Sequence, residues 1–319
     1  MFFRNATGSP LTPAPECLNR GRGRNVRATS LTAMQFWIIQ TLNSLALGGL
    51  LFLLAAGFSL IFGLMRIANL THGSLFMLGA YLGVTVLKIV PNLWLAALLG
   101  GLAVAVFGGL FERLILRPLT GNPLGQVLVT LGVSFIIADL CLMIWGGDPI
   151  PLAPPPSLQR PLILGSIAFP AYRLVVLGIA IVTAIALHLL MDRTRLGAMI
   201  RAGVDDMPMA RAVGIPVSKL FSFVFCLGAA LAGAGGVIAG PIMSAYPGLD
   251  ADMLPLALIV VILGGVGSLL GAFVGSFIIA FIYTFGSALL PDLAYVILFL
   301  PMIAVIAFRP RGLFGRQRT

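Results

Sequence analysis

Long stretches without an acidic or basic residue alternate along this chain with short polar or Pro/Gly-rich segments. One such stretch lies between Ala28 and Met65, and the longest lies between Met253 and Pro291. A helix needs about 20 apolar residues to cross a hydrocarbon core of about 30 Å. The pattern therefore predicts a polytopic bundle of transmembrane helices, in the all-α class, rather than a soluble domain.

The apolar stretches predict about nine crossings, or eight if one segment is re-entrant. The run from Met253 to Pro291 would form about 58 Å of straight helix, so it has to turn. Gly264–Ser268 is where it can turn, which leaves 253–266 as a short, partial span. The Pro-rich segment that opens at Gly146 is predicted to be an extracytoplasmic loop, because proline interrupts helices. The predicted crossings are 36–62, 67–87, 93–114, 124–146, 172–191, 220–244, 253–266, 269–289 and 293–308.

Composition and charge agree with a membrane protein. Hydrophobic residues make up 59% of the chain and charged residues 9%, against about a quarter charged in soluble domains. The net charge of +10 would also suit a nucleic-acid partner. However, the arginines lie in short patches beside apolar segments, as the positive-inside rule describes for cytoplasmic loops. We therefore expect the protein to reside in the lipid bilayer, and we expect no nucleic-acid partner.

The same charges orient the predicted crossings. One side collects Arg66, Arg113, Arg117, the basic residues of 192–219 and the C-terminal tail, whereas the opposite loops carry Lys88, Arg160 and Arg173. The first side is predicted to be the cytoplasm, so the C-terminus is cytoplasmic and the first crossing begins outside.

The first 33 residues differ from the remainder. They are rich in arginine and proline, show no periodicity and lack the apolar core of a signal peptide. We interpret 1–33 as disordered, or as the result of an upstream start codon with Met34 as the natural first residue. Residues 34–319 are then one transmembrane domain. An outside start for the first crossing conflicts with an Arg-rich extension, which is a second reason to set 1–33 apart.

The hydrophilic segment 192–219 predicts a short, bounded helix on the cytoplasmic side. Asp205 or Asp206 can cap its N-terminus, Pro208 fits its first turn, and Gly214 can close its C-terminus. Such a helix would present partly apolar residues for docking: Met207, Met209, Ala210 and Val213. From spacing alone, a docking helix and a solvated connector both remain open.

Polar residues inside predicted crossings are candidates for a substrate path, because they are costly in hydrocarbon. For His72 a helix-packing hydrogen bond is the alternative role. Asp139, in the fourth crossing, could pair with a neighbouring helix or lie near the outer interface. Gly264, Gly265 and Gly267 are candidates for a hinge or for close helix packing. The candidate path residues are Asn43, Asn69, Thr71, His72 and Ser74.

Enzyme chemistry finds little support. The pattern GxxxxGK[ST] is missing, so ATP hydrolysis would have to come from another chain. A membrane prenyl transferase would need two Asp-rich motifs, yet Asp205-Asp206 is the one Asp pair in the sequence. The three cysteines, Cys17, Cys141 and Cys226, lack a paired spacing. We expect no catalytic residue, metal site or cofactor in this chain. A passive channel or secondary carrier is not excluded by these features.

Four segments, in order along the chain, resemble the permease subunits of branched-chain amino acid ABC transporters, the LivH type. They are Asn69-Leu70-Thr71-His72-Gly73 with Gly79-Ala80-Tyr81, Arg195-Leu196-Gly197 through Met209-Ala210-Arg211-Ala212-Val213-Gly214-Ile215, Gly264-Gly265-Val266-Gly267-Ser268, and Arg309-Pro310-Arg311-Gly312-Leu313-Phe314-Gly315. The resemblance runs from about Met34 to the end. Pro208 and Met209 depart from the broader importer pattern, in which Glu and Ala precede a later Gly.

The resemblance implies an ABC importer permease fold in a bacterial inner membrane, powered by separate subunits. Implied partners are two ABC ATPase subunits, a second permease of the LivM type or a second copy of this chain, and a periplasmic substrate-binding protein. Branched-chain amino acids are the default substrates, while relatives carry urea, amides or aromatic acids. The implied ATPase-coupling loop is 197–214 and its surroundings, with Arg195, Gly197, Arg201, Asp205, Asp206, Ala210, Arg211 and Gly214 as candidate contacts.

Overall fold

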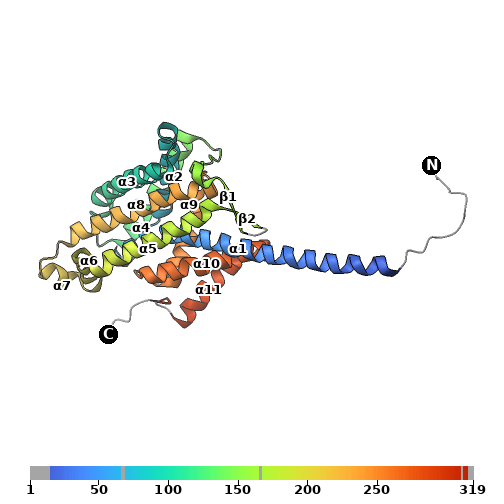
Figure 1. Ribbon diagram of the computed structural model, residues 1–319. Helices are drawn as coiled ribbons and strands as arrows, with labels where there is room; N and C mark the ends of the chain where they lie inside the picture. Colours follow the sequence, from blue (N-terminus) through green and yellow to red (C-terminus); the bar gives the residue numbers. More distant parts are fainter. Residues whose placement is uncertain (1–14, 66–68, 165–166, 310–311, 315–319) are drawn as a thin grey trace, which may run out of the picture.

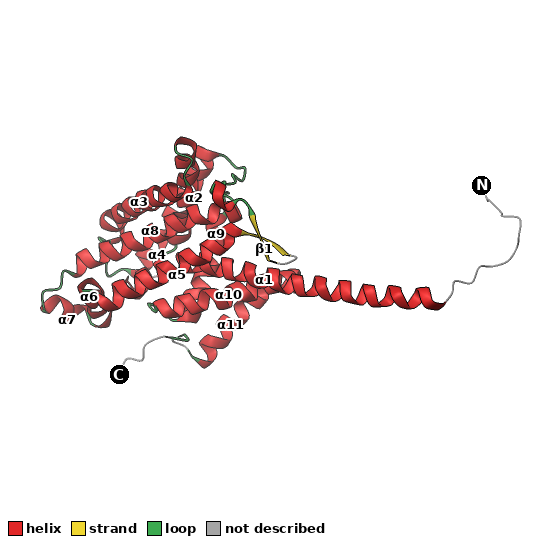
Figure 2. Ribbon diagram, viewed as in Figure 1, coloured by secondary structure: helices red, strands yellow, loops and turns green. Residues whose placement is uncertain are grey.

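The computed structural model describes residues 15–65, 69–164, 167–309 and 312–314 and forms a helical bundle (Figures 1 and 2). Its long helices run roughly side by side and alternate in direction. In chain order, the elements are α1 (Pro15–Met65), α2 (Thr71–Ile89), α3 (Leu93–Phe111), a π-helical turn (Glu112–Leu116), α4 (Pro123–Trp145), a 3-10 turn (Pro156–Leu158), β1 (Pro161–Leu164), β2 (Ile167–Pro170), α5 (Ala171–Arg193), α6 (Arg195–Asp205), α7 (Met207–Ala212), α8 (Val217–Met243), α9 (Leu249–Gly264), α10 (Leu269–Leu289), a 3-10 turn (Pro291–Leu293) and α11 (Ala294–Phe308).

Each of the nine predicted crossings coincides with a helix. Within the described residues, seven helices are long and apolar enough to span a membrane. The other two, α9 with 16 residues and α11 with 15, are shorter. The sequence predicted a short seventh crossing, but α9 begins at Leu249 rather than at residue 253. Gly248 has a φ of 97° there, which lets the chain enter the helix directly from the preceding turn.

Helix α1 extends well beyond the bundle on its N-terminal side (Figure 1). Its membrane-length part is Met34–Met65. Residues 15–33 form the start of α1, and the sequence contains no proline between Pro15 and Pro91 that would interrupt this helix. The expectation that 1–33 is disordered stays a prediction. Residues 1–14 lie outside the described part. An origin of this extension in an upstream start codon stays a prediction.

Helix α8 lies in the middle of the bundle and packs against α1, α2 and α3. Small residues permit the close approach of these helices. A Cβ on Gly57 of α1 would lie 2.6 Å from the carbonyl oxygen of Gly228, and one on Gly236 would meet the backbone of Phe76 in α2. A row of small residues on α8 is buried throughout: Gly228, Ala229, Ala232, Gly233, Gly236 and Gly240.

The Pro-rich segment between α4 and α5 contains more structure than the predicted loop. Strands β1 and β2 pair antiparallel, with Pro161 opposite Pro170. Ile150 also exchanges two backbone hydrogen bonds of 2.8 and 2.9 Å with Ala245, just after α8. The sequence missed these strands because proline dominates the region and the strands are only four residues long.

The turn between α9 and α10 is built from glycines that both bend the chain and allow backbone contact. Gly265 and Gly267 have φ values of 100° and 78°, which favour glycine. A Cβ on Gly264 would meet the backbone of Gly271, and one on Gly63 of α1 would lie 2.6 Å from Gly267 Cα. The C-terminal segment closes this region, because the Leu313 and Phe314 amides donate to the carbonyls of Leu263 and Gly264 at 2.9 and 3.0 Å.

Candidate functional site

Helices α6 and α7 project from one end of the bundle and occupy the predicted coupling loop (Figure 1). The sequence predicted one helix here, and α6 was missed. Thr194 caps α6 by accepting a hydrogen bond of 3.1 Å from the Gly197 amide. Gly197, Ile200 and Gly203 form the buried face of α6, and Gly197 lies directly against the Met191 backbone. Arg195 is exposed at the start of this helix.

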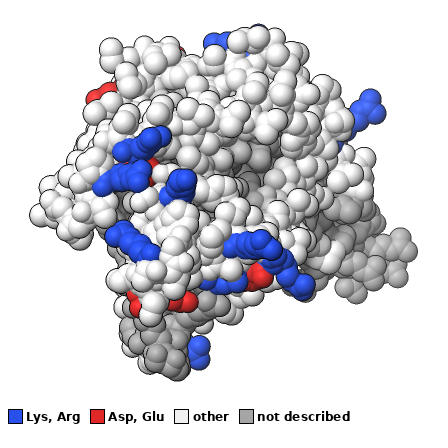
Figure 3. Space-filling model, turned by 90° about the vertical axis from the view of Figure 1, so that its left-hand side faces the viewer, with Lys and Arg blue, Asp and Glu red and all other residues white. Residues whose placement is uncertain are grey.

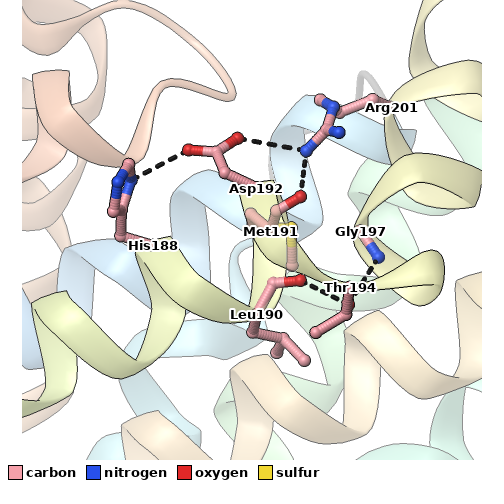
Figure 4. A network of polar contacts seen from close by, with 7 residues as sticks. All are labelled: His188, Leu190, Met191, Asp192, Thr194, Gly197 and Arg201. Atoms are coloured by element: carbon pink, nitrogen blue, oxygen red, sulfur yellow. Dashed lines mark hydrogen bonds and ion pairs between the residues drawn. The ribbon is translucent and has the colours of Figure 1, made fainter.

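A polar network attaches α6 to the end of α5 (Figure 4). Asp192 lies 2.8 Å from His188 Nδ1 and 3.1 Å from Arg201 Nη1. The same Arg201 nitrogen donates to the Met191 carbonyl oxygen. Arg201, predicted as a coupling-loop contact, therefore anchors α6 to α5 within this chain. Such a hydrogen bond is favourable, because the last carbonyl groups of a helix lack partners within the helix and attract cationic side chains.

Helix α7 has the bounds that the sequence predicted. Asp206, rather than Asp205, caps it, since Oδ1 accepts from the Met209 amide at 3.0 Å. Gly214 follows the helix with a φ of 82°. Met209 and Val213 are 60% and 68% exposed, whereas Ala210 is only 3% exposed. The expectation that Ala210 faces outward is wrong, because it packs on the inner face of this short helix. Arg211 is exposed and donates to Met207 Sδ at 3.5 Å.

Basic side chains gather on the end of the molecule that carries α6 and α7 (Figure 3). Few acidic side chains accompany them in this view. One acidic residue of this end, Glu112 in the π-helical turn, is buried and accepts a hydrogen bond of 2.6 Å from Ser222 of α8. Among the described residues, the exposed basic side chains of this end are Arg113, Arg117, Arg193, Arg195, Arg211, Lys219 and Arg309.

The buried face of α4 is mostly polar, although its exposed face is apolar apart from Asp139. Its buried residues recur every three or four positions, so they form one stripe: Gln126, Thr130, Ser134, Ile137 and Cys141. This stripe faces α2. Thr71 Oγ1 donates to the Thr130 carbonyl oxygen at 2.9 Å, and the hydroxyl oxygens of Ser74 and Ser134 are 2.5 Å apart. Ser74 also donates to Asp250 of α9 at 3.0 Å.

We call this arrangement the polar seam, and define it as Asn69, Thr71, Ser74, Gln126, Thr130 and Ser134. Three predicted path residues belong to it: Asn69, Thr71 and Ser74. The three residues on α4 were not predicted, because their only signal in the sequence was the four-residue spacing of polar residues in an apolar stretch. Asp250 was not predicted either, because the seventh crossing was expected to begin at residue 253 and α9 begins at Leu249.

The two other predicted path residues lie elsewhere. His72 Nε2 is 3.0 Å from the Leu54 carbonyl oxygen of α1, and its ring packs against Phe58. This is the helix-packing role considered as the alternative. Asn43, also on α1, accepts a hydrogen bond from Arg173 of α5. The two side chains differ in their contacts because successive residues of a helix point in different directions, so Thr71 and His72 of α2 meet different neighbouring helices.

Asp139 is exposed on α4, about 9 Å from the end of that helix at Trp145. Among the described residues it has no hydrogen-bond or ion-pair partner. Likewise, no group of three or more His, Cys, Asp or Glu residues that could hold a metal ion occurs in the part of the chain described.

Comparisons with known proteins agree with this architecture. The family described as "Branched-chain amino acid transport system / permease component" matches residues 40–306. The permease protein BraD of Pseudomonas aeruginosa, named for high-affinity branched-chain amino acid transport, is 28% identical over 300 residues, covering 89% of this chain and 97% of BraD. LivH of Escherichia coli K12 is 26% identical over 303 residues, covering 89% and 97%. A probable LivH of Methanocaldococcus jannaschii is 29% identical over 294 residues, covering 83% and 89%. No solved structure matches the chain.

Proposed function

We propose a detailed transport role on the premise that this chain belongs to the family of branched-chain amino acid transport permease components. The chain is a multi-pass membrane permease of an importer and not an enzyme. Our proposal concerns its substrate, orientation and partners. The observation that carries it is the pair of helices α6 and α7, which are anchored to the bundle and surrounded by exposed basic residues.

The α6–α7 segment is the docking site for an ABC ATPase subunit. Arg201 and Asp192 hold α6 to α5, and Leu64 at the end of α1 packs 3.9 Å from the Cβ position of Gly203. A displacement of α6 would therefore be transmitted to two membrane helices. Met209 and Val213 offer exposed apolar contacts at the tip. Two ATPase subunits supply ATP hydrolysis, and this chain needs no cofactor of its own.

The α6–α7 end faces the cytoplasm of a bacterial inner membrane, and the C-terminus lies on the same side. The gathering of Arg and Lys at this end supports that orientation, because cytoplasmic loops retain basic residues. A periplasmic binding protein then delivers substrate to the opposite end, which holds β1, β2 and the start of α9.

A second permease subunit, either LivM-like or another copy of this chain, covers the exposed face of α4. The carboxyl group of Asp139 supports this assignment, since an Asp within a span that faces lipid is costly, by up to about 2.5–3.5 kcal/mol at the centre of the span. Contact with a partner or an aqueous path between two subunits would reduce that cost.

The substrate is a branched-chain or related amino acid, which passes along the polar seam between α2 and α4. Urea, amides and aromatic acids are alternatives within the same transporter class. A secondary carrier, which would work without ATPase subunits, is the less favoured alternative, because the anchored α6–α7 segment would then have no docking partner.

The test is uptake of radiolabelled L-leucine in a bacterial host that lacks its own leucine importers. The chain is expressed with its ATPases, second permease and binding protein. We expect uptake that requires the catalytic ATPase residues and that falls strongly with Val213→Asp, which places a charge on the tip of α7. Thr120→Asp, in the exposed turn before α4, is the control, because it adds the same charge outside the α6–α7 segment and should leave uptake near the wild-type rate. Uptake that persists without the ATPases would identify a carrier instead.

A further inference from the structure

A small cavity lies where the polar seam reaches the α6–α7 end of the bundle. Its volume is about 10 Å³, and it lies between the end of α1, the end of the π-helical turn and the first turn of α4. The lining residues are Met65, Asn69, Leu116, Gln126 and Thr130. Two of these side chains are amides, one is a hydroxyl, and two are apolar.

The two amides are held in defined orientations. Asn69 Oδ1 accepts from the Thr71 amide at 3.2 Å, and Gln126 Nε2 donates to the Leu116 carbonyl oxygen at 3.0 Å. These bonds assign the oxygen and nitrogen of each side chain from the network. They leave one donor, Asn69 Nδ2, and one acceptor, Gln126 Oε1.

Neither of these two atoms has a hydrogen-bond partner among the described residues. Both side chains belong to residues that are only 3% exposed. A buried polar group without a partner is unfavourable, and such a group calls for an explanation in a functional protein. Here a free donor and a free acceptor line the same cavity, so one polar ligand could satisfy both.

We propose that Asn69 and Gln126 recognise the main-chain groups of an amino acid as it passes the cytoplasmic end of the seam. The Asn69 amide group donates to the α-carboxylate, and the Gln126 oxygen accepts from the α-ammonium group. Met65 and Leu116 provide apolar surface for an aliphatic side chain. This inference rests on the proposed function and adds the residues that select the substrate class.

The chemistry of the pair suits transport as well as recognition. Neither Asn69 nor Gln126 is charged. Each therefore interacts more weakly with a charged group of the substrate than an oppositely charged side chain would. A transport site has to bind its substrate and also release it. Since an amino acid has both main-chain groups and urea or an organic acid has only part of this pattern, the pair distinguishes among the substrates of this transporter class.

The cavity has to widen before an amino acid can enter, because about 10 Å³ accommodates one water molecule. The bond from Gln126 to the Leu116 carbonyl connects α4 to the π-helical turn, so separation of these elements would open the space. π-Helical turns occur frequently at functional sites. The structure therefore corresponds to a closed arrangement of this end.

The first experiment measures L-leucine uptake by the complete transporter carrying Gln126→Met, which keeps the side-chain length and removes both the free Oε1 acceptor and the Nε2 donor to the Leu116 carbonyl. We expect the maximal uptake rate to fall about 10-fold or more, as follows from losing a hydrogen bond to a charged group. Ser59→Ala is the matched control, because Ser59 Oγ is also buried and without a partner among the described residues but does not line the cavity. It should leave uptake within about twofold of wild type.

The second experiment does not depend on the folding of a Gln126 variant. Thr130→Cys places a thiol at the cavity in a chain whose Cys17, Cys141 and Cys226 are replaced by alanine. The complex is assembled in proteoliposomes and treated with a membrane-permeant maleimide. L-Leucine should slow labelling, whereas 4-methylpentanoate, without an ammonium group, and 3-methylbutylamine, without a carboxylate, should not.

The outcomes separate this inference from the proposed function. Wild-type uptake of L-leucine combined with normal uptake by Gln126→Met, or with equal protection by all three compounds, would overturn the recognition role and leave a cavity that serves hydration only. Absence of wild-type L-leucine uptake, with uptake of urea or an organic acid, would overturn both.

Discussion

Replacement of Gly79 by alanine tests whether backbone contact between α2 and α8 determines the stability of the bundle. A Cβ at Gly79 would contact the Gly233 carbonyl oxygen and Cα, and would lie 2.7 Å from the Gly233 carbonyl carbon. Carbon atoms pack at about 3.5–4.0 Å. The obstructing atoms are backbone, so no side chain can rotate away, and the two helices have to separate by about 1 Å.

The expected cost follows from two opposing contributions. Overpacking in a filled interior costs about 1–3 kcal/mol, and a contact with rigid backbone belongs at the upper end. Replacing a helical glycine by alanine returns up to about 1 kcal/mol in helix propensity. We therefore expect Gly79→Ala to lower the free energy of unfolding by about 1–2 kcal/mol.

The native Cys141 thiol allows this change to be measured in detergent. Cys141 is free and completely buried, so in a chain whose Cys17 and Cys226 are replaced by alanine a thiol-reactive fluorophore reports its exposure as the protein unfolds on heating. We expect the unfolding midpoint of Gly79→Ala to fall by several degrees.

Gly178→Ala is the matched control, because Gly178 also lies within a helix and nothing is within 4 Å of its Cβ position. It should leave the midpoint unchanged or raise it slightly. If Gly79→Ala and Gly178→Ala behaved alike, close backbone packing would not be what holds α2 to α8.

Three further substitutions test the other contacts. Asp206→Ala removes the cap of α7 at a cost of about 1 kcal/mol, so amide hydrogen exchange in α7 should accelerate several-fold, and unchanged exchange would refute the capping role. Gly312→Ala places a Cβ 2.5 Å from the Gly265 backbone at a φ of 80°, so the C-terminal segment should become sensitive to protease; wild-type resistance would contradict this. Ser222→Ala leaves the buried Glu112 carboxyl without its donor and should cost about 1.5–3 kcal/mol in the Cys141 assay. Combining it with Glu112→Gln should cost less than the sum of the two single changes, and strict additivity would argue against a direct interaction.

Much of the bundle was predictable because uncharged length alone identifies a membrane span. All nine predicted crossings coincide with helices, and the glycine turn after Leu263 lies where a 39-residue uncharged run has to fold back. The cap and the end of α7 were predictable as well, since Asp206, Pro208 and Gly214 act on neighbouring backbone. These features depend on interactions within a few residues, which a sequence contains directly.

The candidate site was predicted only in part. Polar residues of α2 were identified, but Gln126, Thr130 and Ser134 were not, since each is isolated in an apolar stretch. In a soluble protein the buried face of a helix is the apolar one, and its phase can be predicted from the pattern. In a bilayer the exposed face is apolar too, so the pattern of α4 does not reveal which neighbour its polar stripe contacts.

The sequence by itself determined the class of the protein, its crossings and the boundaries of its short α7 helix, because these follow from local hydrophobicity and local hydrogen bonding. The tertiary structure alone decided that Asn69, Thr71 and Ser74 join α4 while His72 packs on α1 and Asn43 pairs with Arg173. It also decided that Arg201 bonds to α5 and that Ala210 is buried. The physical reason is that lipid leaves the rotation of each helix open, and only the close contacts between glycine-lined backbones fix which side chains meet.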